Sequence, residues 1–64
     1  MSPMQYIISL RISMAKGYLE NSAKNISEIS NEVGYDNALY FSRLFRKYTG
    51  MTPTEYRKRN RKET

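Results

Sequence analysis

The sequence predicts an all-α fold, a single small domain of about four helices that contains a helix-turn-helix. Apolar residues recur along the 64-residue chain at helical spacing, and no segment alternates with the period of a strand. A Ser, Thr or Asn followed three residues later by Gln or Glu, the pattern of a capping box, occurs at three places. Gly34 and Gly50 end two of the apolar stretches, as expected of residues that readily take the left-handed conformation.

The first helix is expected from Pro3 to about Asn21, with Ser2 and Gln5 as its capping box. Its apolar residues form two adjoining stripes: Tyr6, Ile7, Leu10, Met14 and Tyr18 in one, and Ile8, Ile12, Ala15 and Leu19 in the other. A helix packed on one body needs a single stripe. We therefore expect this helix to lie between two bodies, one of which this chain supplies.

The second helix is expected from Ile26 to about Val33, with Asn25 and Glu28 as its capping box and Gly34 as its stop. The third should run from Asn37 to about Thr49, with Asp36 as a candidate cap. The spacing of four apolar residues predicts its inward stripe: Phe41, Leu44, Phe45 and Tyr48.

The fourth helix is expected from Pro53 to about Arg61, with Thr52 and Glu55 as its capping box and Tyr56 as its main apolar anchor. Its opening, MTPTEY, repeats the chemistry of the first six residues, MSPMQY, so the same helix start is used twice.

A short helix, a tight glycine turn and a longer helix over residues 26–48 follow the pattern of a helix-turn-helix. Ser30, four residues before Gly34, is small enough for two helices to cross closely. In this motif the second helix lies in the major groove of DNA. The segment from 37 to 49 is therefore the candidate recognition helix.

The face opposite the inward stripe carries the candidate DNA contacts. Arg43 can donate two hydrogen bonds to guanine, Ser42 can bond a base or a phosphate, and Ala38 and Leu39 can touch a thymine methyl. The candidate phosphate contacts are Asn37, Arg46, Lys47 and Arg57.

The net charge of +5 is unevenly distributed. Residues 1–41 carry three bases and four acids, whereas residues 42–62 carry eight bases and one acid. This asymmetry predicts a polyanionic partner, nucleic acid before an anionic membrane, although a solvated basic tail would give the same composition. The run Arg57-Lys58-Arg59-Asn60-Arg61-Lys62 is expected to attract phosphates without specifying a sequence.

The composition argues against an enzyme, because there is no histidine, no cysteine and no phosphate-binding glycine loop. We expect no catalytic residue, no metal and no cofactor. There is neither a membrane-spanning apolar run nor a signal-peptide pattern, so the expected location is the cytoplasm.

The stretch NISEISNEVGYDNALYFSRLFRKYTGMTPTEYRKR resembles the C-terminal DNA-binding signature of the AraC/XylS-type transcription regulators of bacteria. The similar residues are Ile29-Ser30, Val33-Gly34-Tyr35, Tyr40-Phe41-Ser42-Arg43, Phe45-Arg46-Lys47, Gly50, Pro53 and Tyr56-Arg57. The resemblance covers about Met1 to Arg59. Ser30 departs from the usual alanine of the family but is also small.

The resemblance implies a homeodomain-like domain with two helix-turn-helix units joined by a long helix. Residues 1–64 would be part of it: a linker helix (3–21), the second unit (26–49) and a closing helix (53–61). The repeated helix start would then follow each unit in turn, with the first unit outside this chain. The implied base contacts are Ala38, Leu39, Ser42 and Arg43, and the implied partners are double-stranded promoter DNA and RNA polymerase.

A second hypothesis is a protein-interaction or dimerisation module that uses Leu39 and the exposed first helix. The free apolar stripe would then be covered by a homodimer or by a swap of that helix. Two smaller expectations concern single side chains. Arg11 could pair with Asp36 or reach a phosphate, and the ion pair is the favoured expectation. Five tyrosines should lie in the core with their hydroxyls at the surface: Tyr6, Tyr18, Tyr35, Tyr48 and Tyr56.

Overall fold

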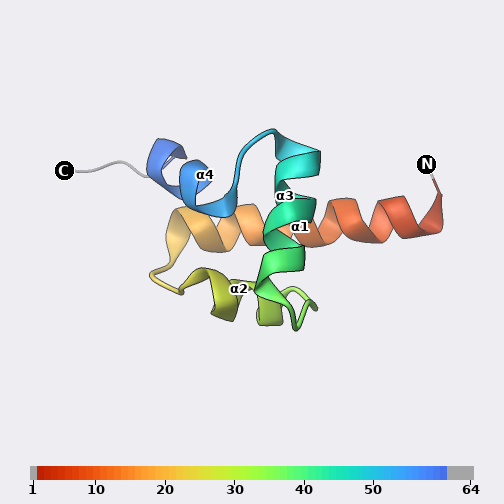
Figure 1. Cartoon of the computed structure of the whole chain (residues 1–64), viewed down its shortest axis with the longest axis horizontal. Helices are drawn as coiled ribbons and strands as arrows, with labels where there is room; N and C mark the ends of the chain where they lie inside the picture. The colour runs from red at the N-terminus through yellow and green to blue at the C-terminus, as the bar shows by residue number, and fades with distance from the viewer. Residues whose placement is uncertain (1, 61–64) are drawn as a thin grey trace.

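The computed structural model describes residues 2–60, and these form four helices with no strand among them. The helices are α1 (Pro3–Asn21), α2 (Ile26–Glu32), α3 (Ala38–Thr49) and α4 (Pro53–Asn60). Figure 1 shows α2, α3 and α4 gathered along the C-terminal part of α1, while the first turns of α1 extend beyond them. The predicted all-α fold is confirmed. None of the helices in residues 2–60 has the length and apolar content needed to cross a bilayer.

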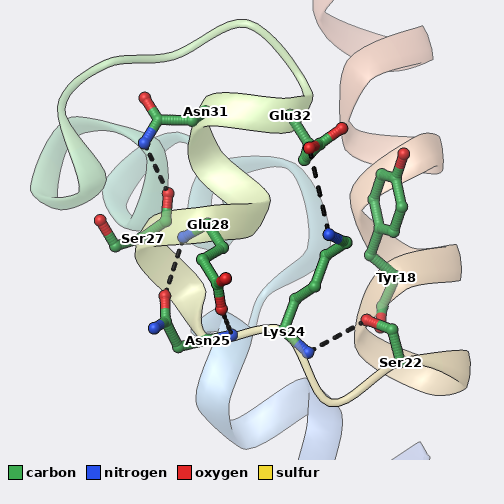
Figure 2. Close-up of polar contacts among 8 residues, drawn as sticks. All are labelled: Tyr18, Ser22, Lys24, Asn25, Ser27, Glu28, Asn31 and Glu32. Atoms are coloured by element: carbon green, nitrogen blue, oxygen red, sulfur yellow. Dashed lines mark hydrogen bonds and ion pairs between the residues drawn. The ribbon is translucent and has the colours of Figure 1, made fainter.

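The three predicted capping boxes are present. The Ser2 hydroxyl accepts the Gln5 N–H at 3.2 Å, and the Gln5 side chain accepts the Ser2 N–H at 3.1 Å. The same pair of bonds joins Asn25 and Glu28 at 2.8 and 2.9 Å (Figure 2). Thr52 and Glu55 form the third box. In that box the pKa of Glu55 is held below its usual value, chiefly by the hydrogen bond from the Thr52 N–H.

The cap of α3 differs from the prediction. Asn37, and not Asp36, is the N-cap residue, and its side-chain oxygen accepts the Tyr40 N–H at 3.0 Å. An N-cap side chain accepts the N–H of the residue two or three positions later, and in α3 Asn37 takes this place directly before Ala38, so Asp36 lies one residue too early. The helix ends agree with the predictions to within one residue, except that Arg61 lies outside the described residues.

The core is formed by the predicted faces of α1 and α2 and by two of the four residues predicted for α3. Its buried apolar residues come from α1, from α2 with its C-cap, and from α3: Ile12, Ala15, Leu19, Ile29, Val33, Phe41 and Phe45. The two phenylalanines are fully buried, with ring centroids 5.9 Å apart, and Tyr56 of α4 meets Phe45 edge-on at 5.5 Å. All four helices therefore contribute to one core.

The two apolar stripes of α1 have different environments, as predicted. The stripe around Ile12 and Leu19 is buried in the core. On the other stripe Tyr6, Ile7, Leu10 and Met14 are exposed, and Tyr18 packs against the core edge. One side of α1 is thus largely exposed, although Ile7 also lines a hollow with Tyr35 and Tyr40.

The prediction for the tyrosines was wrong at three positions. Tyr6 and Tyr48 are exposed, because Tyr6 belongs to the free stripe of α1 and the last turn of α3 projects past α1 (Figure 1). Leu44, another residue of the predicted inward stripe, is only half-buried. Tyr35 packs against the core, but its hydroxyl is buried and has no hydrogen-bond partner within residues 2–60.

The predicted ion pair between Arg11 and Asp36 is absent from residues 2–60. The Arg11 guanidinium instead lies over the ring of Tyr35, with its Cζ 5.1 Å from the ring centroid. Gly34 leaves room for this cation–π contact. A Cβ at position 34 would lie only 3.1 Å from the Arg11 Cζ. The ion pair seen within residues 2–60 joins Lys24 and Glu32 at 4.0 Å on the surface (Figure 2).

The turn between α2 and α3 is held by Ser30 and Tyr35. The buried Ser30 hydroxyl donates to the Tyr35 carbonyl at 2.6 Å, and the Tyr35 N–H donates to the Ser30 carbonyl at 2.8 Å. Between these residues Gly34 has φ +102°, in the region that favours glycine. Gly50, at the end of α3, has φ +84°. A serine at position 30 therefore satisfies a turn carbonyl as well as permitting close helix crossing.

We predict that Gly34→Ala destabilises the fold more than Gly50→Ala. Each substitution introduces backbone strain of about 1–3 kcal/mol. At Gly34 the new Cβ must also displace the Arg11 guanidinium, whereas nothing lies within 4 Å of a Cβ at Gly50. Urea unfolding should give the larger loss for Gly34→Ala, and the excess should shrink in an Arg11→Ala background. Equal losses at both glycines would contradict the contact with Arg11.

A second prediction concerns the contact between α4 and α1. The Tyr56 hydroxyl donates to Glu20 Oε2 at 2.5 Å, and this bond raises the pKa of Tyr56 from its ordinary value of 10 to about 12. The unfolded chain loses this proton first, so the stabilisation is complete below pH 10 and is lost as the pH rises towards 12.

Unfolding of the wild type and of Tyr56→Phe should be compared between pH 8 and pH 12. The wild type should lose more of its free energy of unfolding over the upper part of this range, so the two curves should converge. Parallel curves would show that the hydroxyl does not couple to Glu20.

Candidate nucleic-acid interface

The orientation of α3 is set by its two ends and its buried side. Asn37 fixes the first turn as the N-cap, and Gly50 ends the helix in the left-handed conformation. Phe41 and Phe45 are fully buried against the other helices. Because α3 is attached along one side, the opposite side of the same helix must face solvent.

The four predicted base contacts lie together on the N-terminal half of α3. Leu39 is 63% exposed, and Arg43, one turn later, is also exposed. Ala38 and Ser42 are half-buried at the edge of the same face. An exposed leucine next to an exposed arginine can make both an apolar contact with a thymine methyl and a paired hydrogen bond with a guanine.

Three of the predicted phosphate contacts also lie at the surface of this region. Arg46 and Lys47 are exposed in the last turn of α3, where positive charge complements the helix dipole. Asn37 is exposed, but its side-chain oxygen is used in capping, so its amide N–H groups are the part that can donate. Arg43 and Lys47 make no hydrogen bond or ion pair with any residue from 2 to 60, so their donors can serve a ligand.

Arg57 has a different environment from the one predicted. Its guanidinium donates to three carbonyl oxygens: those of Leu19 at 3.2 Å, Ser22 at 3.2 Å and Lys24 at 2.6 Å. These carbonyls belong to the end of α1 and to its connection with α2, where helix-end groups lack intrahelical partners. Arg57 therefore attaches α4 to the end of α1 and to the connection that follows it. These bonds direct its guanidinium to the protein backbone and not to a phosphate.

Tyr40 is a surface residue of this face that is not among the predicted DNA contacts. It is 54% exposed, and its ring centroid lies 5.9 Å from that of Tyr35. The predicted inward stripe of α3 includes Tyr48, which places Tyr40 at the edge of the outer face. Since Tyr48 is exposed and Ala38 and Ser42 are half-buried, the outer face is rotated towards Tyr40. A wheel centred on Phe41 and Phe45 alone would have included it.

A family model described as a helix-turn-helix domain matches residues 1–59. This chain belongs to the AraC-type helix-turn-helix family. The expectation drawn from the signature in residues 25–59 is thereby confirmed.

Curated relatives of this AraC-type chain are bacterial regulators. It is 40% identical over 60 residues to the MmsAB operon regulatory protein of Pseudomonas aeruginosa, covering 94% of this chain and 20% of that protein. It is 47% identical over 47 residues to the arabinose operon regulatory protein of Salmonella typhimurium, covering 73% of this chain and 17% of that protein. The chain thus spans about a fifth of the length of these relatives.

Solved structures of AraC-type domains share the fold. The C-terminal domain of AraT, a response regulator from Geobacillus stearothermophilus, superposes with a TM-score of 0.95 at 32% identity, over 98% of this chain and 52% of that one. The DNA-binding domain of AdpA, solved in complex with a target DNA, gives a TM-score of 0.87 at 27% identity, over 92% of this chain and 53% of that one. This chain spans about half of each of these domains.

We predict that Arg57→Ala destabilises the fold by about 1.5–3 kcal/mol, because three carbonyls lose a charged hydrogen-bond donor. Arg59→Ala, which removes an exposed charge two residues later on α4, should change the free energy of unfolding by less than about 0.5 kcal/mol. Thermal or urea unfolding checks both values. Arg57→Lys keeps the charge but lacks the planar set of donors, so it should resemble Arg57→Ala. A lysine variant as stable as the wild type would contradict this structural role.

Proposed function

We propose that this chain binds double-stranded DNA sequence-specifically, as part of a bacterial transcription regulator, with α3 in the major groove. The observation that carries the proposal is the outward face of α3, where Leu39, Arg43 and Arg46 are exposed opposite the buried Phe41 and Phe45. The similarity to the AdpA domain, which was solved with its target DNA, supports it. The positive charge of residues 42–62 favours the same partner.

The proposed contacts divide into two groups. Ala38, Leu39, Ser42 and Arg43 lie on the N-terminal half of α3, the part of a recognition helix that contacts base edges, and we assign them to the bases. Asn37, Arg46 and Lys47 flank them and are assigned to phosphates. Tyr40 joins the interface as a neighbour of Leu39 and Arg43, because it is exposed on the same face.

We infer further that residues 3–21, 26–49 and 53–61 act as a linker helix, a helix-turn-helix and a closing helix in a longer domain. The support is that the chain spans 52% and 53% of two similar DNA-binding domains. A chain that acts on promoter DNA works in the bacterial cytoplasm, where RNA polymerase is the partner that such a regulator meets.

The proposal predicts different effects for Arg43→Ala and Lys47→Ala. A preferred duplex is first selected from randomised DNA with the wild type. Arg43→Ala should then lose about 1–3 kcal/mol of discrimination at one base pair, whereas Lys47→Ala should weaken binding to all duplexes and reduce the salt slope by about 1. Fluorescence anisotropy at several salt concentrations measures both effects.

Lys24→Ala is the matched control, because it removes one positive charge from the connection between α1 and α2, which holds none of the proposed DNA contacts. The variant also breaks the exposed ion pair with Glu32, and a surface pair of this kind contributes little to stability. Lys24→Ala should leave the base preference unchanged. The proposal fails if Arg43→Ala weakens binding to the selected duplex and to random duplexes by the same factor.

A further inference from the structure

The first turn and a half of α3 carries mainly apolar side chains on the face that is proposed to enter the major groove. We propose that this face selects thymine by its C5-methyl group, through Leu39, and that it accepts 5-methylcytosine in place of thymine at the same base pair. The inference rests on the proposed function, because it names the chemical feature of the DNA that α3 reads. It follows that methylation of cytosine at this base pair strengthens binding.

Few of the side chains that can reach bases form hydrogen bonds. Within residues 38–43, ALYFSR, the polar side-chain groups are the hydroxyls of Tyr40 and Ser42 and the guanidinium of Arg43. These six positions hold no asparagine or glutamine, which pair with adenine, and no acidic residue, which accepts from cytosine. Arg43 can select guanine, whereas the half-buried Ser42 can bond more than one kind of base. The feature of an A·T pair that remains to be read is therefore the thymine methyl.

The nearest amide side chain, that of Asn37, is used in the helix cap. Its Oδ1 accepts the Tyr40 N–H at 3.0 Å. A paired contact with adenine needs the oxygen and the nitrogen of one amide together. While Asn37 caps α3, its oxygen is directed to the backbone and only its N–H donors remain for DNA. These donors suit a phosphate, so Asn37 does not supply the missing readout of adenine.

Leu39 is the apolar side chain best placed for a methyl contact. It is 63% exposed, more than any other large hydrophobic residue of α3. The ring of Tyr40 beside it lies 5.9 Å from that of Tyr35 and lines a hollow with Arg11 of α1. Tyr40 thus lies on the α1 side of this face and leaves Leu39 free. A base methyl packed on Leu39 would remove two apolar surfaces from water, which favours binding.

The spacing of Leu39 and Arg43 limits where the methyl group can lie. The two exposed residues are four positions apart, so they are neighbours on the helix surface. Four residues span about 6 Å along a helix. Successive base pairs are roughly 3.4 Å apart. The thymine should therefore lie within about two base pairs of the guanine that Arg43 contacts.

Thymine and 5-methylcytosine carry the methyl group at the same ring position in the major groove. They differ in the neighbouring polar group, which is a carbonyl acceptor in thymine and an amino donor in cytosine. The side chain of Leu39 has no donor and no acceptor, so it forms no hydrogen bond that would distinguish the two. Unmethylated cytosine lacks the apolar contact and should bind more weakly than either.

Replacement of single thymines by deoxyuridine in the selected duplex tests the proposal with the whole chain. Deoxyuridine keeps the base pair and its polar edge and removes only the methyl group. At one thymine, within two base pairs of the guanine at which Arg43→Ala loses discrimination, the affinity should fall about three- to fivefold. At that position a 5-methylcytosine·guanine pair should bind about as well as the thymine·adenine pair, and an unmethylated cytosine·guanine pair about three- to fivefold more weakly.

Two variants separate the methyl contact from general effects of the base changes. Leu39→Ala leaves the core intact, because Leu39 is exposed, and should reduce the difference between thymine and deoxyuridine to less than about twofold. Lys47→Ala, at a proposed phosphate contact, should weaken binding to both duplexes and leave their ratio unchanged. A ratio that stays the same in Leu39→Ala would show that another group reads the methyl and would overturn the proposal.

The outcomes for this inference and for the proposed function are distinct. A selected duplex that binds equally well with deoxyuridine at every thymine would overturn the methyl readout and leave sequence-specific DNA binding standing. Equal affinity for methylated and unmethylated cytosine would do the same. A wild type that selects no preferred duplex would overturn the proposed function, and the methyl readout with it.

Discussion

The packing of Phe41 and Phe45 against α1 is the interaction on which the rest of this structure depends. Both rings are fully buried among Ile12, Ala15 and Leu19 of α1 and the apolar residues of α2. Aromatic side chains bury more area than any others, and a chain of 64 residues without a disulfide has few other sources of stability. Since α3 is a single helix, fixing one side of it also fixes the direction of Leu39 and Arg43. The proposed DNA-binding face is therefore a direct consequence of the core.

Polar contacts around this core determine how the helices are connected. Ser30 satisfies the carbonyl of Tyr35 in the turn before α3, and Arg57 satisfies three carbonyls at the connection between α1 and α2. Tyr56 joins α4 to Glu20 of α1. Each of these contacts satisfies a polar group or links segments that apolar packing alone would leave free to shift. Together they make a small core sufficient to hold the turn of the helix-turn-helix in one conformation.

The two sides of α1 have separate roles. One side forms the floor of the core, and the other carries a row of exposed apolar residues, a kind of patch that often marks a contact surface. Both α1 and α4 begin with a capping box whose first residue is followed by proline. Thus α1 joins the core on one side and exposes large apolar side chains on the other, and α3 carries the proposed DNA-binding face.

The sequence by itself determined the local structure and the division into faces. Capping boxes, glycine stops and apolar spacing depend on residues a few positions apart, and for this reason the four helices and the buried pair Phe41 and Phe45 could be predicted. The outward direction of Leu39 and Arg43 followed from the same spacing. The family signature over residues 25–59 depended on sequence alone as well.

Only the tertiary structure decided which partner each long side chain takes. Arg11 lies over the ring of Tyr35 instead of pairing with Asp36. Arg57 donates to backbone carbonyls more than thirty residues earlier in the chain, although it was predicted to face a phosphate. Tyr48 is exposed because α1 does not extend beneath the last turn of α3. These outcomes depend on where helices end and cross in space. A long flexible side chain can reach several partners, and which of them it contacts depends on the groups that the fold brings near it. The spacing of residues along one helix does not determine this.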